Sequence, residues 1–157
     1  MSENDGGPAT PPDADGSVAP AVAHDANPTL RGLVLVVEDS RPTASVVKHF
    51  LELEGFTVIV ADNGDLGLEI ARRERPDVIV TDVQMPGMDG VALVTALRAD
   101  ARTSDIRIMM LTSESSAEGV VRGLSAGADD YLLKPVEPHG LAARVKALRA
   151  RPRSRPA

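Results

Sequence analysis

TDVQMPGMDG, residues 81–90, begins at the last residue of a short apolar run, residues 78–81, that has the composition of a buried strand. Its proline and two glycines interrupt any regular element. At its end, Asp89 is suited to cap a helix in which Leu93, Val94 and Leu97 share one face. The segment therefore predicts a strand, a polar loop and a helix in immediate succession.

The same alternation recurs along the chain. Five short apolar runs are typical of strands buried on both faces: residues 33–37, 57–61, 78–81, 106–111 and 131–133. A helical pattern follows each run, with start and stop signals at Pro42 and Gly55, Asn63 and Pro76, Asp89, the Ser115–Glu118 capping box and Gly127, and Pro138. Strands that alternate with helices predict a doubly wound α/β domain, a five-stranded parallel sheet with five helices over its two faces.

The two ends of the chain differ from this centre. Residues 1–30 carry five acids, no Lys or Arg, and many Pro, Gly and Ala residues, so we expect a disordered extension. Residues 151–157 belong to an Arg- and Pro-rich basic tail that begins at Arg149, and residues 31–150 form the expected domain. The formal charge of −6 leaves about −5 for the middle of the chain, which argues against sequence-specific nucleic-acid binding.

Composition excludes several classes of protein. There is no Cys, which removes disulfides and thiolate metal sites, and aromatic residues make up only 2% of the chain. The first residues lack the basic start of a signal peptide, and no apolar run is long enough to span a membrane. We therefore expect a cytoplasmic protein with no membrane insertion.

Polar residues follow the predicted strands where parallel strands bring their carboxyl ends to one edge of the sheet, the usual ligand edge of such folds. They are Glu38 and Asp39, then Asp82, then Thr112 and Ser113, and finally Lys134. Three carboxylates in one place need positive charge, because like charges raise one another's pKa. Lys134 supplies one charge, and oxygen ligands without His or Cys favour Mg²⁺ as the other.

This set of groups suggests phosphoryl transfer onto an aspartate. A carboxylate can act as the nucleophile, while Lys134 and the Thr112 hydroxyl contact the phosphoryl oxygens. Each residue alone has an ordinary structural explanation, such as a turn or a helix cap. The functional interpretation depends on all of them falling at the ends of different strands.

The motifs VVEDS (36–40), TDVQMPGMDG (81–90), LTSE (111–114) and SAGADDYLLKP (125–135) together resemble the receiver domain of two-component response regulators. The resemblance covers the chain from about Arg31 to Arg149. It implies a flavodoxin-like sheet with strand order 2-1-3-4-5. It also implies a phosphoacceptor signalling domain, which is not a conventional enzyme.

The resemblance implies a role for each matching residue. Asp82 would accept the phosphoryl group from a sensor histidine kinase or a histidine phosphotransfer protein. Asp39 and Asp82 would hold Mg²⁺, with Glu38 helping through water and the backbone carbonyl of Gln84 completing the protein ligands. Contacts to the phosphoryl group would come from Thr112 and Lys134, and the switch aromatic would be Tyr131.

The chain departs from the family pattern at two positions. Glu38 stands where many members have Asp, and Val136 stands after Lys-Pro where Phe is common. Neither change removes a charge or a hydroxyl from the predicted site. The Lys134–Pro135 bond resembles one that is cis in the family.

Other functions fit the sequence less well. A dinucleotide-binding domain would need a glycine-rich turn after the first strand, where Glu38 and Asp39 stand instead. A Mg²⁺-dependent phosphatase with an aspartyl nucleophile is a closer alternative, but Gln84 occupies the place of its usual second acid. The output is open: we expect a stand-alone regulator that acts on a downstream protein target, and the alternative is a receiver excised from a hybrid kinase or multidomain regulator.

Overall fold

The computed structural model describes residues 32–113 and 117–150. The expected disordered extension, residues 151–157 of the basic tail and Ser115 of the predicted capping box lie outside these residues, whereas Arg149 belongs to the last helix.

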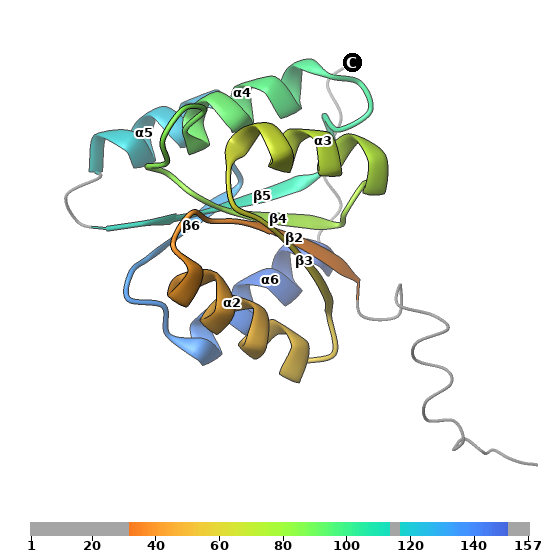
Figure 1. Ribbon diagram of the computed structural model, residues 1–157, viewed down its shortest axis with the longest axis vertical. Coiled ribbons are helices and arrows are strands. Elements are labelled where there is room, and N and C mark those ends of the chain that lie inside the picture. Colours follow the sequence, from red (N-terminus) through yellow and green to blue (C-terminus); the bar gives the residue numbers. More distant parts are fainter. Residues whose placement is uncertain (1–31, 114–116, 151–157) are drawn as a thin grey trace, which may run out of the picture. The chain divides into compact units, whose positions relative to one another are not determined.

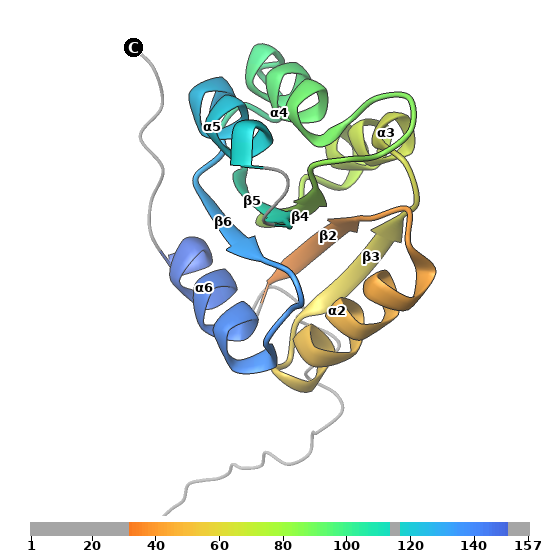
Figure 2. The same ribbon diagram turned by 90° about the vertical axis from the view of Figure 1, so that its left-hand side faces the viewer.

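A five-stranded sheet forms the centre of the domain, and every neighbouring pair of strands is parallel. The strand order is β3-β2-β4-β5-β6, which is the predicted order 2-1-3-4-5 (Figure 2). The strands are β2 (Leu33–Val37), β3 (Thr57–Ala61), β4 (Val78–Asp82), β5 (Arg107–Thr112) and β6 (Asp130–Leu133).

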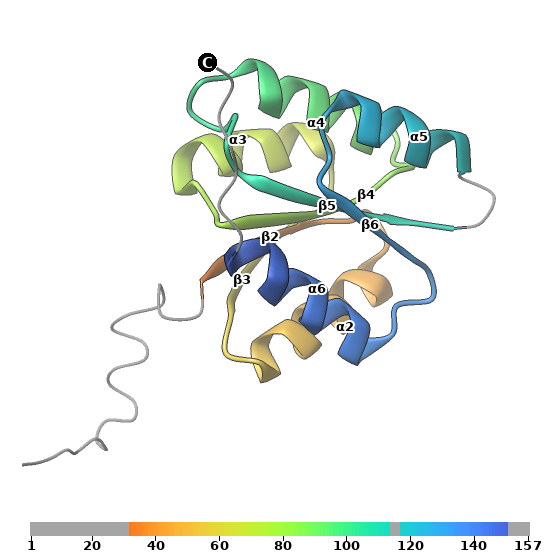
Figure 3. The ribbon, with the colours of Figure 1, turned by 180° about the vertical axis from the view of Figure 1, so that it is seen from behind.

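Helices cover both faces of this sheet, as a doubly wound fold requires. Helices α2 and α6 lie on one face, and α3, α4 and α5 lie on the other (Figures 1 and 3). The helices are α2 (Arg41–Leu53), α3 (Gly64–Glu74), α4 (Gly90–Ala99), α5 (Ala117–Ala126) and α6 (Pro138–Ala150). None of these helices, over the residues described, has the length and apolar character needed to cross a membrane.

Side-chain caps fix where three helices begin. Ser40, Asn63 and Asp89 each accept a hydrogen bond from a backbone N–H in the first turn of α2, α3 and α4. Gly55 and Gly127 follow α2 and α5 with φ of 97° and 124°, a left-handed conformation that favours glycine. The starts of α3 and α4 and the stops at Gly55 and Gly127 agree with the sequence prediction. Helix α2 begins at Arg41, one residue before the predicted Pro42, and α3 ends at Glu74, two residues before Pro76.

Two aliphatic clusters form the core, one on each face of the sheet. The alternation along β4 shows the division, since Ile79 packs among α3 and α4 while Val78 and Val80 face the α2 and α6 side. Burial on both faces explains why the central strands are continuous apolar runs in the sequence.

Two strands run further toward their carboxyl ends than predicted. Asp82 is the last residue of β4 and pairs with Leu111, and Thr112 is the last residue of β5 and pairs with Leu133. Parallel pairing therefore holds the main chain of both polar residues within the sheet. A strand prediction based on apolar residues ends before them.

Arg98 of α4 binds the two segments that lead into β5 and β6, at the amino-terminal ends of these strands. Its guanidinium donates to the carbonyls of Gly127, Ser104 and Ile106 and to the Asp129 carboxylate, over 2.6–3.1 Å. The same Asp129 oxygen accepts from the Ile108 N–H at 2.8 Å. Both side chains are only 13% exposed, so this ion pair lies largely out of solvent.

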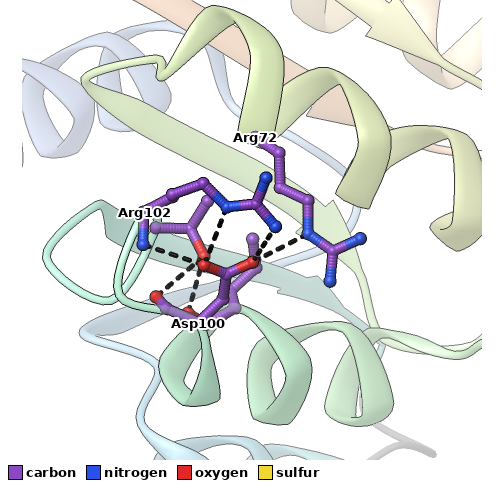
Figure 4. A network of polar contacts seen from close by, with 5 residues as sticks. Arg72, Asp100 and Arg102 are labelled. Carbon is purple, nitrogen blue, oxygen red and sulfur yellow. Dashed lines mark hydrogen bonds and ion pairs between the residues drawn. The ribbon is translucent and has the colours of Figure 1, made fainter.

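A second Arg–Asp group lies nearby and is more exposed. Arg72 of α3 and Arg102 both bind the Asp100 carboxylate, at 2.8 and 2.9 Å (Figure 4). Hydrogen bonds from the Arg102 side chain and N–H, with a further bond from Arg72, lower the pKa of Asp100. Because Asp100 has two cationic partners, it keeps one when the other is removed.

These two groups should differ in their effect on stability. Arg98→Ala is expected to lower the free energy of unfolding by about 3 kcal/mol, because it leaves the Asp129 carboxylate largely buried without this partner. Arg72→Ala should cost less than about 1 kcal/mol, as an exposed ion pair does. Urea denaturation of both variants measures this difference, and equal losses would contradict it.

Candidate functional site

The carboxyl edge of the sheet gathers most of the residues that the sequence singled out. Glu38 follows β2, and its N–H donates to the Ala61 carbonyl of β3 at 3.0 Å, which continues the strand pairing by one residue. Asp82 ends the neighbouring strand β4, and Lys134 follows β6. Three different strands therefore deliver two carboxylates and an ammonium to one place.

Three carboxylates form a cluster at this edge. One oxygen from each of Glu38, Asp39 and Asp82 lies within 4.8 Å of the other two. Glu38 and Asp82 are buried, whereas Asp39 is exposed. The cluster is thus open on one side and has a buried floor, and its oxygen ligands are those that hard divalent cations prefer. It is an acidic cluster that could hold a metal ion.

Lys134 supplies the positive charge within this cluster. Its Nζ lies 3.1 Å from Glu38 Oε1 and 3.3 Å from Asp82 Oδ1, so one ammonium pairs with both buried carboxylates. Burial alone would lower the pKa of Lys134. The Glu38 hydrogen bond and the charges of Asp82 and Glu38 outweigh burial, so the pKa is raised and Lys134 stays charged.

Glu38 responds differently to the same surroundings. Burial raises its pKa to about 7, and the Asp82 charge adds to this effect. The Ser40 N–H, 3.1 Å from Glu38 Oε2, and Lys134 act in the opposite direction. Without a further cation, Glu38 therefore exchanges a proton near neutral pH.

Thr112 lies next to this cluster at the end of β5. Its side chain is buried, and its hydroxyl donates to the Ser113 carbonyl at 3.1 Å. Its own carbonyl accepts a 2.6 Å hydrogen bond from the Lys134 N–H. The main chain thus links Thr112 directly to the residue that carries the ammonium.

Tyr131 lies apart from the acidic cluster, three residues before Lys134 on the edge strand β6. It is 39% exposed, and burial alternates along β6 so that Tyr131 and Leu133 are the exposed residues of the strand. Between β6 and α6, the Lys134–Pro135 bond is cis, as the resemblance implied. Val136 and Lys134 line a cavity of about 290 Å³ with Pro42, Thr43, Val46 and Pro135.

Gln84 is exposed in the loop that joins β4 to α4. This loop is fixed at its base, because the Val83 N–H donates to the Leu111 carbonyl and the Gly90 N–H donates to the Val83 carbonyl, at 3.2 and 2.8 Å. The role of the Gln84 carbonyl stays a prediction.

Sequence reasoning missed two contributors to this site. Ser40 was not considered as a donor, although its N–H binds Glu38 while its side chain caps α2. A signal was present, since Ser40 stands three residues before Thr43, the usual spacing of an N-cap. The sequence identifies Gly90 only as a residue that interrupts a regular element. Its close contact with the backbone of Asp82 is visible only in the structure.

Comparison with known proteins agrees with this geometry. Residues 34–146 match the family described as the response regulator receiver domain. The transcriptional regulatory protein PrrA of Mycobacterium tuberculosis is 47% identical over 115 residues, which cover 73% of this chain and 48% of PrrA. The chain therefore spans about half the length of this relative.

Solved structures share the fold. A putative response regulator from Chloroflexus aurantiacus superposes with a TM-score of 0.74 at 35% identity, covering 76% of this chain and 98% of that one. The receiver domain of the sensor histidine kinase PA1611 from Pseudomonas aeruginosa gives 0.72 at 27% identity, with coverage of 76% and 98%, and was solved with a magnesium ion in its active-site cleft.

These findings favour the predicted family over the phosphatase alternative, because the match extends across all five strands and reaches into α6. Receiver domains are phosphoacceptor signalling modules and not conventional enzymes. The chain belongs to the response regulator receiver domain family of two-component signalling.

Proposed function

We propose that the domain accepts a phosphoryl group on Asp82 from the phosphohistidine of a sensor kinase or phosphotransfer protein. The observation that carries this proposal is the pairing of one ammonium, Lys134, with two buried carboxylates beside the exposed Asp39. A structural ion pair would need one carboxylate. The additional acidic groups on an open edge are explained by a cation and a phosphoryl group that bind there.

Asp82 is the proposed nucleophile. One of its carboxylate oxygens forms a bond to phosphorus as the bond to the histidine nitrogen breaks, and that nitrogen keeps the electron pair. Asp82 is buried and fixed at the end of a central strand, so its position before the reaction is largely set. Lys134 lies close enough to Asp82 to bind an oxygen of the transferred group once the carboxylate has become an acyl phosphate.

The proposed metal is Mg²⁺, held by Asp39, Asp82 and the Gln84 carbonyl, with Glu38 assisting. The three carboxylates present an all-oxygen donor set of the right charge, and a related receiver was solved with magnesium in its cleft. When bound, Mg²⁺ offsets negative charge on the phosphoryl group and on the carboxylates. The ion pair between Glu38 and Lys134 lies at the buried side of the site.

Thr112 and Tyr131 are the proposed switch residues. The Thr112 hydroxyl now donates to its neighbour Ser113, and rotation toward a phosphoryl group on Asp82 would exchange that bond for a charge-assisted one. Two glycines within α5, Gly119 and Gly123, lower its helix propensity and leave this helix among the elements easiest to rearrange. The surface around Tyr131 would then change its partner preference by population shift.

A second candidate concerns the context of this receiver. PrrA is a transcriptional regulatory protein about twice as long as its match to this chain, which favours a receiver that controls an attached output domain. The size of the native protein, detected with an antibody against the domain, distinguishes this arrangement from a stand-alone regulator that acts on a downstream protein.

Phosphorylation should depend on Asp82. Incubation with Mg²⁺ and an acyl-phosphate or phosphohistidine donor is expected to add one phosphoryl group, and Asp82→Asn should abolish the addition because the nucleophilic oxygen is replaced. Intact-mass spectrometry measures it. Asp89→Asn is the matched control, because asparagine also caps a helix. Equal labelling of Asp82→Asn would refute the assignment.

Magnesium affinity should rise with pH through about 7. Below its raised pKa, Glu38 holds a proton that opposes the binding of a cation, so the apparent affinity at pH 6 should be about tenfold weaker than at pH 8. Isothermal titration calorimetry at both pH values measures this change. Glu38→Gln should bind more weakly and lose most of the pH dependence; a dependence as steep as that of the wild type would show that another group titrates.

Tyr131 should report the switch. The chain has one Tyr and no Trp, so its intrinsic tyrosine emission comes from Tyr131 alone. Mg²⁺ with beryllium fluoride, a phosphoryl mimic, is expected to change this emission in the wild type and to change it less in Thr112→Ala. If the mimic binds and neither the emission nor the ring resonances of Tyr131 respond, the aromatic switch is wrong while the role of Asp82 stands.

A further inference from the structure

Two helices, α3 and α4, begin with a glycine, and both glycines lie against the loop between β4 and α4. Gly64 begins α3 and Gly90 begins α4. Neither has a positive φ, so a left-handed backbone does not explain them. Alanine is the better helix former, so these glycines must serve another purpose, which the contacts of each one show.

Gly90 packs against the backbone of the phosphoacceptor strand. A Cβ at this position would overlap the Asp82 carbonyl oxygen and lie 2.9 Å from Val83 Cα. These are main-chain atoms of a paired strand, which cannot move aside as a flexible side chain can. Gly90 therefore fixes the base of the loop, together with its own hydrogen bond to Val83.

Gly64 packs against the far end of the same loop. A Cβ here would lie 2.6 Å from the Met88 carbonyl oxygen and 2.9 Å from both Met88 Cβ and Cγ. The Asn63 side chain accepts from the Leu66 N–H at 2.8 Å, so the first turn of α3 is itself held in place. A methyl group at residue 64 must therefore displace the loop, or displace the helix against its cap.

The rest of the loop connects Met88 to Asp82 through residues that are themselves held in place. Val83 and Met85 are buried in the core on either side of Gln84, and Met88 is partly buried against the same core cluster. The loop thus has a fixed base at Val83 and Gly90, a core anchor at Met85, and a contact with α3 at Met88. Three residues separate Met88 from Gln84, so we expect a shift at Met88 to alter the position of Gln84.

We propose that Gly64, eighteen residues before Asp82, is a positioning residue for the metal-binding loop. It allows α3 to contact Met88 closely enough to hold Gln84 at the rim of the acidic cluster. This inference rests on the proposed role of the cluster in holding Mg²⁺. In this proposal, the β3–α3 junction affects cation binding through the loop, and none of its side chains contacts the ion.

The test uses Gly64→Ala in the full chain. Its Mg²⁺ dissociation constant by calorimetry is expected to rise about tenfold, the usual effect of losing support for a metal ligand. In the metal-free protein, the NMR amide resonances of residues 83–90 should shift. Gly140→Ala is the matched control, because its Cβ would meet only a carboxylate oxygen of the exposed Glu137, and it should keep the wild-type values.

Two further variants separate positioning from general damage. Val145→Ala removes a core methyl pair on the α6 side and should lower stability without changing the Mg²⁺ dissociation constant. Met88→Ala keeps the carbonyl and Cβ but removes Cγ and the side chain that packs Met88 against the core. This change loosens the loop side of the contact without adding an atom, and it should weaken Mg²⁺ binding several-fold even if Gly64→Ala does not fold.

The outcomes are distinguishable. Folded Gly64→Ala with the wild-type dissociation constant and unshifted loop resonances overturns the proposal, and so does a loss that Val145→Ala reproduces. If Gly64→Ala fails to fold, wild-type binding by a folded Met88→Ala overturns it instead. A wild-type chain that binds no Mg²⁺ refutes the proposed function first, and the positioning role falls with it.

Discussion

Lys134 pairs with two buried carboxylates, and the arrangement of the carboxyl edge depends on that ion pair. Glu38 and Asp82 come from neighbouring strands, so their charges repel each other where solvent cannot screen them. A buried carboxylate is costly without a cation close by. The ammonium satisfies both, and the backbone bond from Lys134 to Thr112 fixes the loop that delivers it.

Lys134 does not neutralise all the negative charge of the acidic cluster, and the charge that is left affects what can bind there. One ammonium faces three carboxylates, and burial, with the Asp82 charge adding to it, raises the pKa of Glu38, so the cluster favours uptake of positive charge. A proton on Glu38 removes one negative charge, whereas a divalent cation would offset two. The exposed Asp39 favours a cation, because an open side leaves room for water and phosphate oxygens around the ion.

Much of this arrangement could be predicted from the sequence. The central strands are buried on both faces and therefore stand out as apolar runs, and the topology then brings Glu38, Asp82 and Lys134 to one edge, where the structure places them in contact. Other features could not be predicted, because they depend on contacts between distant segments. The burial of Glu38 beside an exposed Asp39, the Arg98–Asp129 pair and the contact of Gly64 with Met88 leave no periodic signal.

The Arg98 group also restrains one end of α5. Its guanidinium binds the Gly127 carbonyl just beyond the carboxyl end of that helix, while the amino end follows from Thr112 on the opposite side of the sheet. A helix that is restrained at one end moves least at that end, so any displacement near Thr112 would be largest at the amino end of α5 and smallest near Gly127. In the proposed switch, this restraint would confine rearrangement to the amino end of α5, and a partner that distinguishes the two states would do so by contacting its first turns.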